Sequence, residues 1–351
     1  MFNITFKTRQ RLKRLGTTAL VVALALVIAW FCWIVWLERY VVYTQDGAKV
    51  DFTLNDQPPG FGQVAEPAAP AETVSIYYNE GAAAVETSTE LEQLNGYYID
   101  VTMLQDIDSV RSKISMLPAG TAVMLDVKSI HGAFYYSTSL DANLDHRVIP
   151  TEVDALIKDI NARNLYTIAR LPSLRDRDFG LNNVSAGLPL PGGYLWMDSE
   201  GCYWLDPTDA QALAWITAQV KELQTLGFDE VVLSDWRFPD GERIVFNADK
   251  TASLVEAAQT LVNNCGSDTF CVSFLVNTPS ITLPAGRVRM YLEGVTPRNI
   301  AVNAGLTTVD NLPVKLVFVS TANDTRYDEY GALRPLTSAD ALEAQKAEAS
   351  E

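Results

Sequence analysis

Carboxylate, indole and guanidinium groups follow one another where a short apolar run ends in the middle of the chain. Asp235, Trp236 and Arg237 come directly after the run at 230–234. Gly227 precedes this run and can adopt the left-handed conformation that ends a helix, so the predicted order is helix, turn, buried strand and polar loop. A carboxyl group at such a strand end can transfer a proton or act as a nucleophile, and the planar guanidinium of arginine can orient it.

Other carboxyl groups also follow apolar runs. Asp126 ends one run and Glu293 ends another. Two carboxyl groups that face one another across a bond can act together in its cleavage, one as the acid and one as the nucleophile or base. Asp126, Asp235 and Glu293 are therefore the candidate catalytic residues. The alternative for each is an ion pair that only fixes a loop.

Candidate substrate-binding residues stand near these carboxylates in the sequence. Arginine and lysine can bind polar groups of a ligand or neutralise a carboxylate, and tryptophan can stack on a flat ligand ring or pack in the interior. The chain has only two histidines and no paired-cysteine motif, so we expect neither a metal site nor a cofactor. The candidates for substrate binding are Lys128, Arg170, Trp196, Trp204, Trp236 and Arg237.

The elements that must position these residues alternate between apolar runs and helical patterns, which is typical of βα units and a parallel sheet. Helices are predicted at 107–116, 151–163, 208–226 and 249–263. The fold class is therefore α/β, a TIM-type (β/α)8 barrel over residues 95–335 that is either complete or lacks a strand. Seven strands are predicted at 97–102, 121–127, 166–171, 230–235, 269–276, 287–292 and 314–320, and an eighth near 299–302 would close the barrel.

Two connections on the carboxyl-terminal side of the predicted strands are long. Residues 128–150 follow the second strand, and residues 172–205 follow the third. Loops beyond about 12 to 15 residues usually have a function or are disordered. Because a TIM barrel carries its active site on this face, we expect both loops to border it.

Four ordered motifs resemble the signature of a bacterial family of putative glycoside hydrolases, TIM barrels distantly related to the α-amylase group. Trp236 stands where that family has tyrosine. The resemblance covers residues 95–240 well and the rest of the barrel poorly, as if the second half were degenerate. The motifs are VMLDVK at 123–128 with Gly132 and Tyr136 downstream, YTIAR at 166–170, WLDP at 204–207 and GFDEVVLSDWRFP at 227–239.

The resemblance implies roles for the carboxylates. Asp235 takes the fourth-strand position at which α-amylase relatives have their nucleophile, so it would be the nucleophile or base. After the fifth strand the family has an acidic residue, but this chain reads VSFLVNTP at 272–279. Glu293 or Asp126 would then have to supply the acid. Loss of one carboxylate can remove acid–base assistance while sugar binding remains.

The N-terminus has the composition of a membrane anchor. Five lysines and arginines in residues 1–16 precede an uncharged apolar run at 17–37 that is long enough to cross a bilayer as a helix. The positive charges should keep residues 1–16 in the cytoplasm, and three tryptophans near the far end favour the membrane interface. We predict an uncleaved signal anchor with the barrel outside the cytoplasm, and the alternatives are cleavage or a buried helix.

The remaining segments are polar and acidic. Residues 38–94 are rich in Ala, Pro, Glu and Gly and predict an extended linker, and residues 336–351 form an acidic tail. All 43 acidic residues lie after residue 37, and the net charge is −16, so nucleic acid and anionic lipid surfaces are disfavoured partners. Cys265 and Cys271 flank a short loop on the predicted oxidising side, where a disulfide and two free thiols are the alternatives.

The sequence thus predicts a membrane-anchored, extracytoplasmic protein of the glycoside hydrolase type that hydrolyses or binds a polysaccharide or oligosaccharide. The first alternative is a non-catalytic carbohydrate-binding barrel, because the fifth-strand carboxylate is missing. The second is a scaffold in an envelope complex, with the linker setting its reach.

Overall fold

The computed structural model describes Trp30, residues 41–44 and 47–50, and residues 90–338. Apart from Trp30, the predicted membrane segment 17–37 lies outside the described residues, as do most of the predicted linker and tail. Within the described part, no helix is both long enough and apolar enough to cross a bilayer. The chain divides into two units after Glu66, and each is described by itself.

The N-terminal unit contains a short β-hairpin. Strand β1 (Val41–Thr44) pairs antiparallel with β2 (Gly47–Val50). Both strands fall within the segment that the sequence predicts as a linker, so this part of the segment has regular structure.

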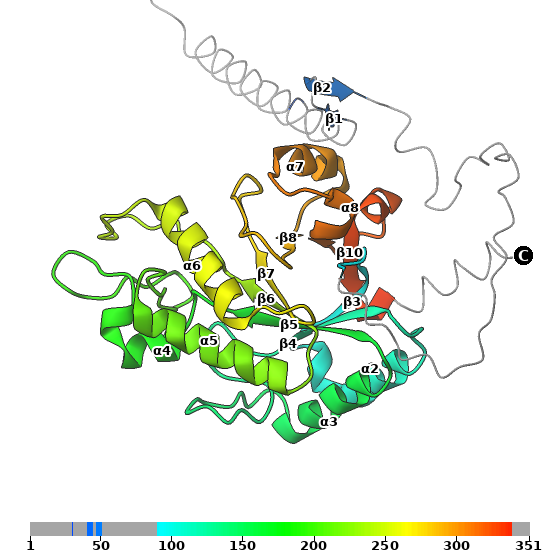
Figure 1. Cartoon of the computed structure of the whole chain (residues 1–351), viewed down its shortest axis with the longest axis horizontal. Coiled ribbons are helices and arrows are strands. Elements are labelled where there is room, and N and C mark those ends of the chain that lie inside the picture. Colours follow the sequence, from blue (N-terminus) through cyan, green and yellow to red (C-terminus); the bar gives the residue numbers. More distant parts are fainter. Residues whose placement is uncertain (1–29, 31–40, 45–46, 51–89, 339–351) are drawn as a thin grey trace, which may run out of the picture. The chain divides into compact units, whose positions relative to one another are not determined.

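The second unit contains a closed barrel of eight parallel strands with helices around it (Figure 1). Each strand pairs with the next one along the chain, and β10 pairs with β3 to close the barrel. The predicted TIM-type barrel is confirmed, and it is complete. Its strands are β3 (Asn95–Ile99), β4 (Ala122–Asp126), β5 (Tyr166–Pro172), β6 (Glu230–Ser234), β7 (Cys271–Leu275), β8 (Met290–Glu293), β9 (Leu316–Val319) and β10 (Gly331–Pro335).

The eighth strand was predicted in the wrong place. Residues 299–302 lie at the end of a 3-10 turn and in helix α7 (Ile300–Leu306). The buried residues of α7 are Ile300 and Ala304, and a spacing of four residues fits one face of a helix. The strand that closes the barrel is β10, about thirty residues further along the chain.

Helices connect the strands on the outside of the barrel (Figure 1). Asp106, Asp209 and Asp249 each cap one helix by accepting a hydrogen bond from a backbone N–H group of its first turn. All four predicted helices are present near their predicted bounds. The helices are α2 (Ile107–Ile114), α3 (Pro150–Asn161), α4 (Arg177–Asn182), α5 (Ala210–Thr225), α6 (Lys250–Cys265), α7 and α8 (Leu312–Lys315), with 3-10 turns at Met103–Gln105, Val184–Ala186, Pro297–Asn299, Thr325–Glu329 and Leu336–Ser338.

Alternation along each strand decides which side chains enter the barrel. On β4, Ala122 and Met124 belong to the apolar cluster inside the barrel, so Asp126 points the same way at the end of the strand. On β5, the same alternation from Ile168 brings Arg170 inward. Asp126 and Arg170 are also direct partners in the strand register. Asp126 and Arg170 therefore form a polar layer at the carboxyl-terminal end of the barrel. Its position follows from the alternation of side chains along each strand and from the pairing register of β4 and β5.

An ion pair fills the amino-terminal end of the barrel. Glu230 and Arg289 are almost completely buried, with 2.5 Å between Glu230 Oε2 and Arg289 Nη1. The hydroxyl groups of Tyr166 and Tyr291 each donate a hydrogen bond to the Glu230 carboxylate at 2.9 Å. Arg289 also donates to the backbone carbonyl of Glu92 at 2.8 Å. Because both charges have several partners, their burial is compensated.

Candidate active site

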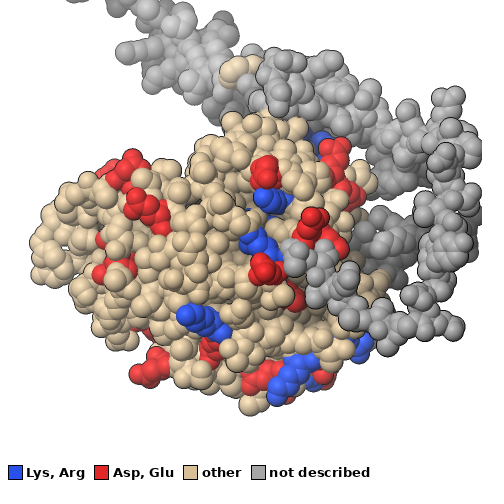
Figure 2. Space-filling view, in the orientation of Figure 1, with Lys and Arg blue, Asp and Glu red and all other residues tan. Residues whose placement is uncertain are grey.

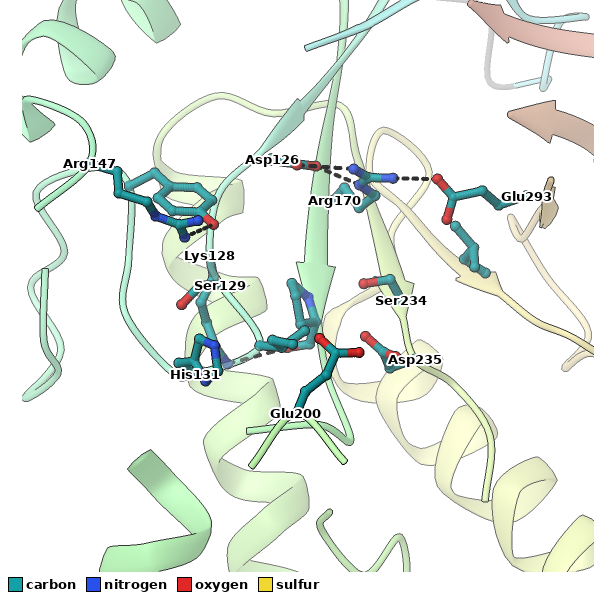
Figure 3. Close-up of a pocket in the computed structure, with 14 residues that line it drawn as sticks. Asp126, Lys128, Ser129, His131, Arg147, Arg170, Glu200, Ser234, Asp235 and Glu293 are labelled. Atoms are coloured by element: carbon teal, nitrogen blue, oxygen red, sulfur yellow. Dashed lines mark hydrogen bonds and ion pairs between the residues drawn. The ribbon is translucent and has the colours of Figure 1, made fainter. Parts of the chain in front are cut away.

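A cavity of about 450 Å³ opens at the carboxyl-terminal ends of the barrel strands (Figure 3). The ends of β4, β5, β6 and β8 contribute polar residues to it, and the long loops after β4 and β5 complete its wall. This is the face on which TIM barrels carry their active sites. The candidate residues Asp126, Lys128, Arg170, Asp235 and Glu293 border the cavity, together with Ser129, Ile130, His131, Tyr135, Arg147, Pro172, Glu200, Ser234 and Leu275.

Arg170 connects two of the candidate carboxylates (Figure 3). Its Nη2 atom lies 3.0 Å from Asp126 Oδ2, its Nε atom 2.5 Å from Asp126 Oδ1, and its Nη1 atom 2.8 Å from Glu293 Oε1. Burial alone would lower the pKa of Arg170, but the two carboxylates outweigh burial and raise it. The Glu293 side chain is 49% exposed and that of Asp126 is 15% exposed, so Glu293 is the more accessible carboxylate.

Asp235 follows β6 in a left-handed backbone conformation, with φ of 53°. This region is uncommon for residues other than glycine, although aspartate tolerates it better than most. Burial raises the pKa of Asp235 against the opposing effects of Arg175 and Arg237, and the charge of Glu293 adds to the rise. Backbone strain and a perturbed carboxyl group at one position are features that cluster at active sites.

The loop after β5 brings a fourth carboxylate, Glu200, which the sequence analysis missed. Arg175 Nη2 lies 2.6 Å from Asp198 Oδ2 and 3.1 Å from Glu200 Oε1. Asp198 also accepts hydrogen bonds from Trp204 Nε1 at 2.9 Å and from the backbone N–H of Glu200 at 2.9 Å. Asp198 therefore fixes the turn that carries Glu200. The only available signal was the position of this turn in a loop predicted to border the active face.

The loop after β4 adds further polar residues to the cavity, and these also belong to none of the sequence motifs. The Tyr135 hydroxyl accepts a hydrogen bond from Arg147 Nη2 at 3.0 Å, and Arg147 also pairs with Asp145 at 2.8 Å. Burial raises the pKa of Tyr135 to about 12, although Arg147 opposes the rise. His131 Nδ1 lies 3.4 Å from Cys202 Sγ. The cavity thus contains more cationic and aromatic groups than the sequence motifs indicated.

Lys128 is not available as a substrate-binding residue, which corrects the sequence prediction. Its buried ammonium group donates hydrogen bonds to Asp176 at 2.7 Å, to Gln219 at 2.8 Å and to the carbonyl of Pro172 at 3.2 Å. An ammonium group has three donors, and all three are used. Trp215 Nε1 donates to the same Asp176 carboxylate at 3.0 Å. Lys128 therefore holds the two long loops and α5 together beneath the cavity.

Two of the three candidate tryptophans are buried and cannot stack on a sugar in this structure. Trp204 and Trp236 are each 1% exposed. The guanidinium groups of Arg175 and Arg237 lie 5.7 and 4.7 Å from the centroid of the Trp204 ring. Trp236 packs against Phe274, with 4.9 Å between ring centroids. The prediction that these two rings bind substrate by stacking is therefore wrong for this conformation.

Trp196 and Arg237 are partly exposed but lie outside this cavity. Trp196 packs on the core and against Gly241, where an added Cβ atom would lie 2.5 Å from the indole ring. Arg237 borders a neighbouring cavity. Sequence proximity to Asp235 did not place Arg237 in the same cavity, because successive side chains leave the backbone in different directions, and the place of Trp196 depends on the path of the long loop after β5.

Of the two alternatives for Cys265 and Cys271, a disulfide or two free thiols, the structure has the free thiols. Cys265 and Cys271 are buried free thiols, and the Cys271 thiol donates a hydrogen bond to the carbonyl of Arg287 at 3.1 Å. Burial raises the pKa of both thiols, so neither is an activated nucleophile. Among the residues that the structure describes, no group of three or more His, Cys, Asp and Glu side chains has the arrangement of a metal site.

The fold and the cavity define a TIM-barrel protein with a pocket of acidic and basic side chains where such barrels carry their active sites. Residues 96–267 match the model of a family described as "Putative glycosyl hydrolase domain". This match confirms the resemblance inferred from the four motifs. The match ends before β7, where the chain departs from the pattern of the family.

Solved structures resemble this chain at low sequence identity, and two α-galactosidases share the barrel fold. An α-galactosidase of family GH36 from Geobacillus stearothermophilus, in complex with raffinose, has a TM-score of 0.51 and 10% identity over 74% of this chain and 42% of its own. The α-galactosidase from Lactobacillus brevis has a TM-score of 0.50 and 7% identity over 74% and 40%. A hypothetical protein from Ruminiclostridium thermocellum has a TM-score of 0.43 and 18% identity over 56% and 96%. The chain therefore spans less than half the length of these α-galactosidases, and no curated protein matches it significantly.

Proposed function

We propose that this protein is a glycoside hydrolase that cleaves an oligosaccharide or polysaccharide at the mouth of its barrel. The observation that carries the proposal is the pair Asp235 and Glu293, two carboxyl groups in one open cavity and in different electrostatic environments. Because β7 separates β6 from β8, the two groups stand on different parts of the cavity wall, as a sugar bound between them requires. The family match and the raffinose complex of the Geobacillus enzyme support a sugar as the ligand.

The environments of the two carboxyl groups favour different roles. Burial favours the protonated form of Asp235, which suits a group that donates a proton to the leaving oxygen. Glu293 forms an ion pair with Arg170, an arrangement that suits a charged nucleophile or base. Asp126 holds the same guanidinium through both oxygens and so orients it. This assignment reverses the role that the family resemblance implies for Asp235.

The proposal is tested with the full-length chain by measuring the release of reducing ends from a panel of bacterial and dietary polysaccharides. Asp235→Asn and Glu293→Gln each remove one carboxyl group with little change of shape, and we expect each to lower kcat/KM by at least about 100-fold. Glu242→Gln is the control, because Glu242 is exposed on the loop after β6 and lines neither cavity. Full activity in Asp235→Asn, or no turnover on any substrate, would contradict the proposal.

The leaving group of the substrate distinguishes the two roles. A dinitrophenyl glycoside needs no proton on its leaving oxygen, whereas a phenyl glycoside does. We therefore expect Asp235→Asn to lose far less activity on the dinitrophenyl substrate, and Glu293→Gln to lose activity equally on both. The opposite pattern would restore Asp235 as the nucleophile or base.

A non-catalytic carbohydrate-binding barrel is the second candidate function, and the end of β7 favours it. Leu275 borders the cavity there, and Asn277 and Thr278 follow in place of a carboxylate. A glycan that binds both the unaltered protein and Asp235→Asn, with no product from either, would identify this function.

Membrane anchoring through residues 17–37 remains part of the proposal. Its support is the basic segment at 1–16, followed by an apolar run long enough to cross a bilayer. We expect the full-length chain to stay in the membrane fraction after alkaline carbonate extraction, and a chain without residues 1–37 to be released. Protease added outside intact cells should degrade the barrel, and protection of the barrel would contradict the proposed orientation.

A further inference from the structure

A second cavity, of about 290 Å³, lies beside the candidate active site. It is bordered by the loops after β6 and β7 and by the first turn of α6. Asp235 lines the first cavity, and the next two residues, Trp236 and Arg237, line the second. Two residues span at most about 7 Å of chain, so neighbouring units of one ligand can reach both cavities.

The two cavities differ in charge. Arg237 and Lys250 line the second cavity together with one carboxylate, Asp240. The nearest carboxylate to Arg237 is Asp240, at 3.9 Å with a 99% exposed side chain, and a contact of this kind contributes little. The Lys250 ammonium lies 5.5 Å from the centroid of the Phe238 ring. The first cavity has the opposite balance, with the four carboxylates Asp126, Glu200, Asp235 and Glu293 against the three basic side chains Lys128, Arg147 and Arg170.

Hydrogen-bond donors add to this positive charge. Lys250 and Thr251 begin the 16-residue helix α6, so their backbone N–H groups have no intrahelical acceptor and stand at the positive end of the helix dipole. The cap residue Asp249 accepts through its side chain only from Ala252. Trp236 lines the same cavity, and its buried Nε1 has no hydrogen-bond partner among the described residues.

We propose that the second cavity binds an anionic sugar residue, one that carries a carboxylate or a phosphate, while the catalytic cavity holds a neutral residue of the same glycan. This inference rests on the proposed function and specifies its substrate class. Arg237 offers a planar fork of donors to the anion, and Lys250 and the start of α6 add charge-assisted hydrogen bonds. The carboxylates of the first cavity outnumber its basic side chains, whereas the basic side chains outnumber the carboxylate in the second, so charge favours placing the anionic residue in the second cavity. The substrate is thus an acidic heteropolysaccharide.

The test measures affinity by calorimetry with the full-length chain. The probes are maltotetraose and cellotetraose, each in a neutral form and with one unit oxidised to a carboxylate or phosphorylated at C6. We expect an anionic form to bind about tenfold more tightly than its neutral parent, and added salt to reduce the difference. Arg237→Gln and Lys250→Gln should each remove most of this preference. Arg243→Gln removes an exposed positive charge from the same loop, lines neither cavity and should keep the preference.

The comparison of carboxylated and phosphorylated probes identifies which anion the cavity prefers. Lys250 is exposed at the first position of α6, so its substitution tests the inference even if Arg237→Gln disturbs the packing on Trp204. Equal affinity for neutral and anionic forms, no binding of either, or a preference that survives in Lys250→Gln would overturn the inference. Because binding is measured, a preference for the anion without hydrolysis would refute only the proposed enzyme, and hydrolysis without the preference would refute only this inference.

Discussion

Asp235 combines a left-handed backbone with a partly buried carboxyl group, and both lower the stability of the folded protein. Because the pKa of Asp235 is raised in the folded state, the folded protein binds its proton more tightly than the unfolded chain does. The stabilisation that comes from this tighter proton binding is fully present below the pKa of Asp235 in the unfolded chain. It is lost as the pH rises through the pKa of Asp235 in the folded protein. Such a penalty at neutral pH is typical of a residue kept for function.

Asp235→Asn should therefore stabilise the protein at pH 7. We expect the free energy of unfolding to rise by on the order of 1 kcal/mol at pH 7, and to change little below about pH 3.9, where the carboxyl group is protonated in both states. Urea denaturation at the two pH values measures the difference, with Glu242→Gln as the control. A loss of stability at pH 7 would mean that attraction to the arginines outweighs burial.

The Lys128–Asp176 ion pair supports the cavity from below, and its side chains are almost fully buried. Lys128→Met leaves the Asp176 carboxylate charged and buried without its partner, and we expect a loss of about 3 to 5 kcal/mol in the free energy of unfolding. Adding Asp176→Asn should recover part of that loss. Urea denaturation measures both variants, and Lys158→Met, at an exposed position, should be nearly neutral. A loss below 1 kcal/mol in Lys128→Met would contradict a structural role.

The sequence named the cavity-lining residues that lie at or just after strand ends and missed those that lie further along the loops. Asp126, Arg170 and Glu293 were found because strand alternation and the parallel sheet decide where they point. Glu200 and Arg147 were missed because their positions depend on the paths of long loops, which no local pattern encodes. The same limit explains the errors at the tryptophans, since spacing alone does not say which side of a loop is buried.

At the scale of elements, β3 and β4 approach each other closely at a glycine. A Cβ atom on Gly96 would lie 1.9 Å from the carbonyl oxygen of Ala122. The contact is with backbone, so no side-chain rotation can relieve it.

We expect Gly96→Ala to prevent correct closure of the barrel, with a loss of about 3 kcal/mol or more, or no soluble folded protein. Near-ultraviolet circular dichroism and urea denaturation measure the effect. Gly120→Ala is the matched control, because Gly120 has a positive φ of 82° but open space around its Cα, and it should cost only about 1 kcal/mol. A Gly96→Ala protein of unchanged stability would contradict the close approach of β3 to β4.

Propensity and periodicity located seven strands and four helices but failed at the end of the barrel. The segment GALRP of β10 has few residues that favour strands, whereas its pairing with both β9 and β3 makes it one. Residues 299–302 have the opposite character, since a short apolar pattern is ambiguous between helix and strand. Long-range strand pairing therefore determines which segment forms the last strand of the barrel, and local sequence does not.

At the scale of the whole molecule, the excess of negative charge lowers the stability of the compact folded state. The chain has a net charge of −16, and acidic and basic side chains are interspersed on the face that Figure 2 shows. Surface pairs such as Arg111–Asp159 contribute little individually, so the excess of negative charge is not offset by them.

Screening this charge should stabilise the protein. We expect an increase in NaCl from 20 to 300 mM to raise the Tm by about 2 to 4 °C, because self-repulsion among acidic groups is reduced. Differential scanning calorimetry at pH 7 measures the shift. The same change at pH near 4.6, the calculated isoelectric point, should have a smaller effect. A fall in Tm at pH 7 would mean that attractive ion pairs dominate.

The pairing of the last barrel strand with the first has a consequence for how the protein is made. β10 forms hydrogen bonds with β3, whose residues are synthesised more than two hundred positions earlier. Until β10 has left the ribosome, β3 and β9 both carry unpaired backbone groups, and the sheet behaves as an open edge that other chains can join. A stop codon just before Gly331 would therefore yield an aggregating chain and not a slightly shortened barrel.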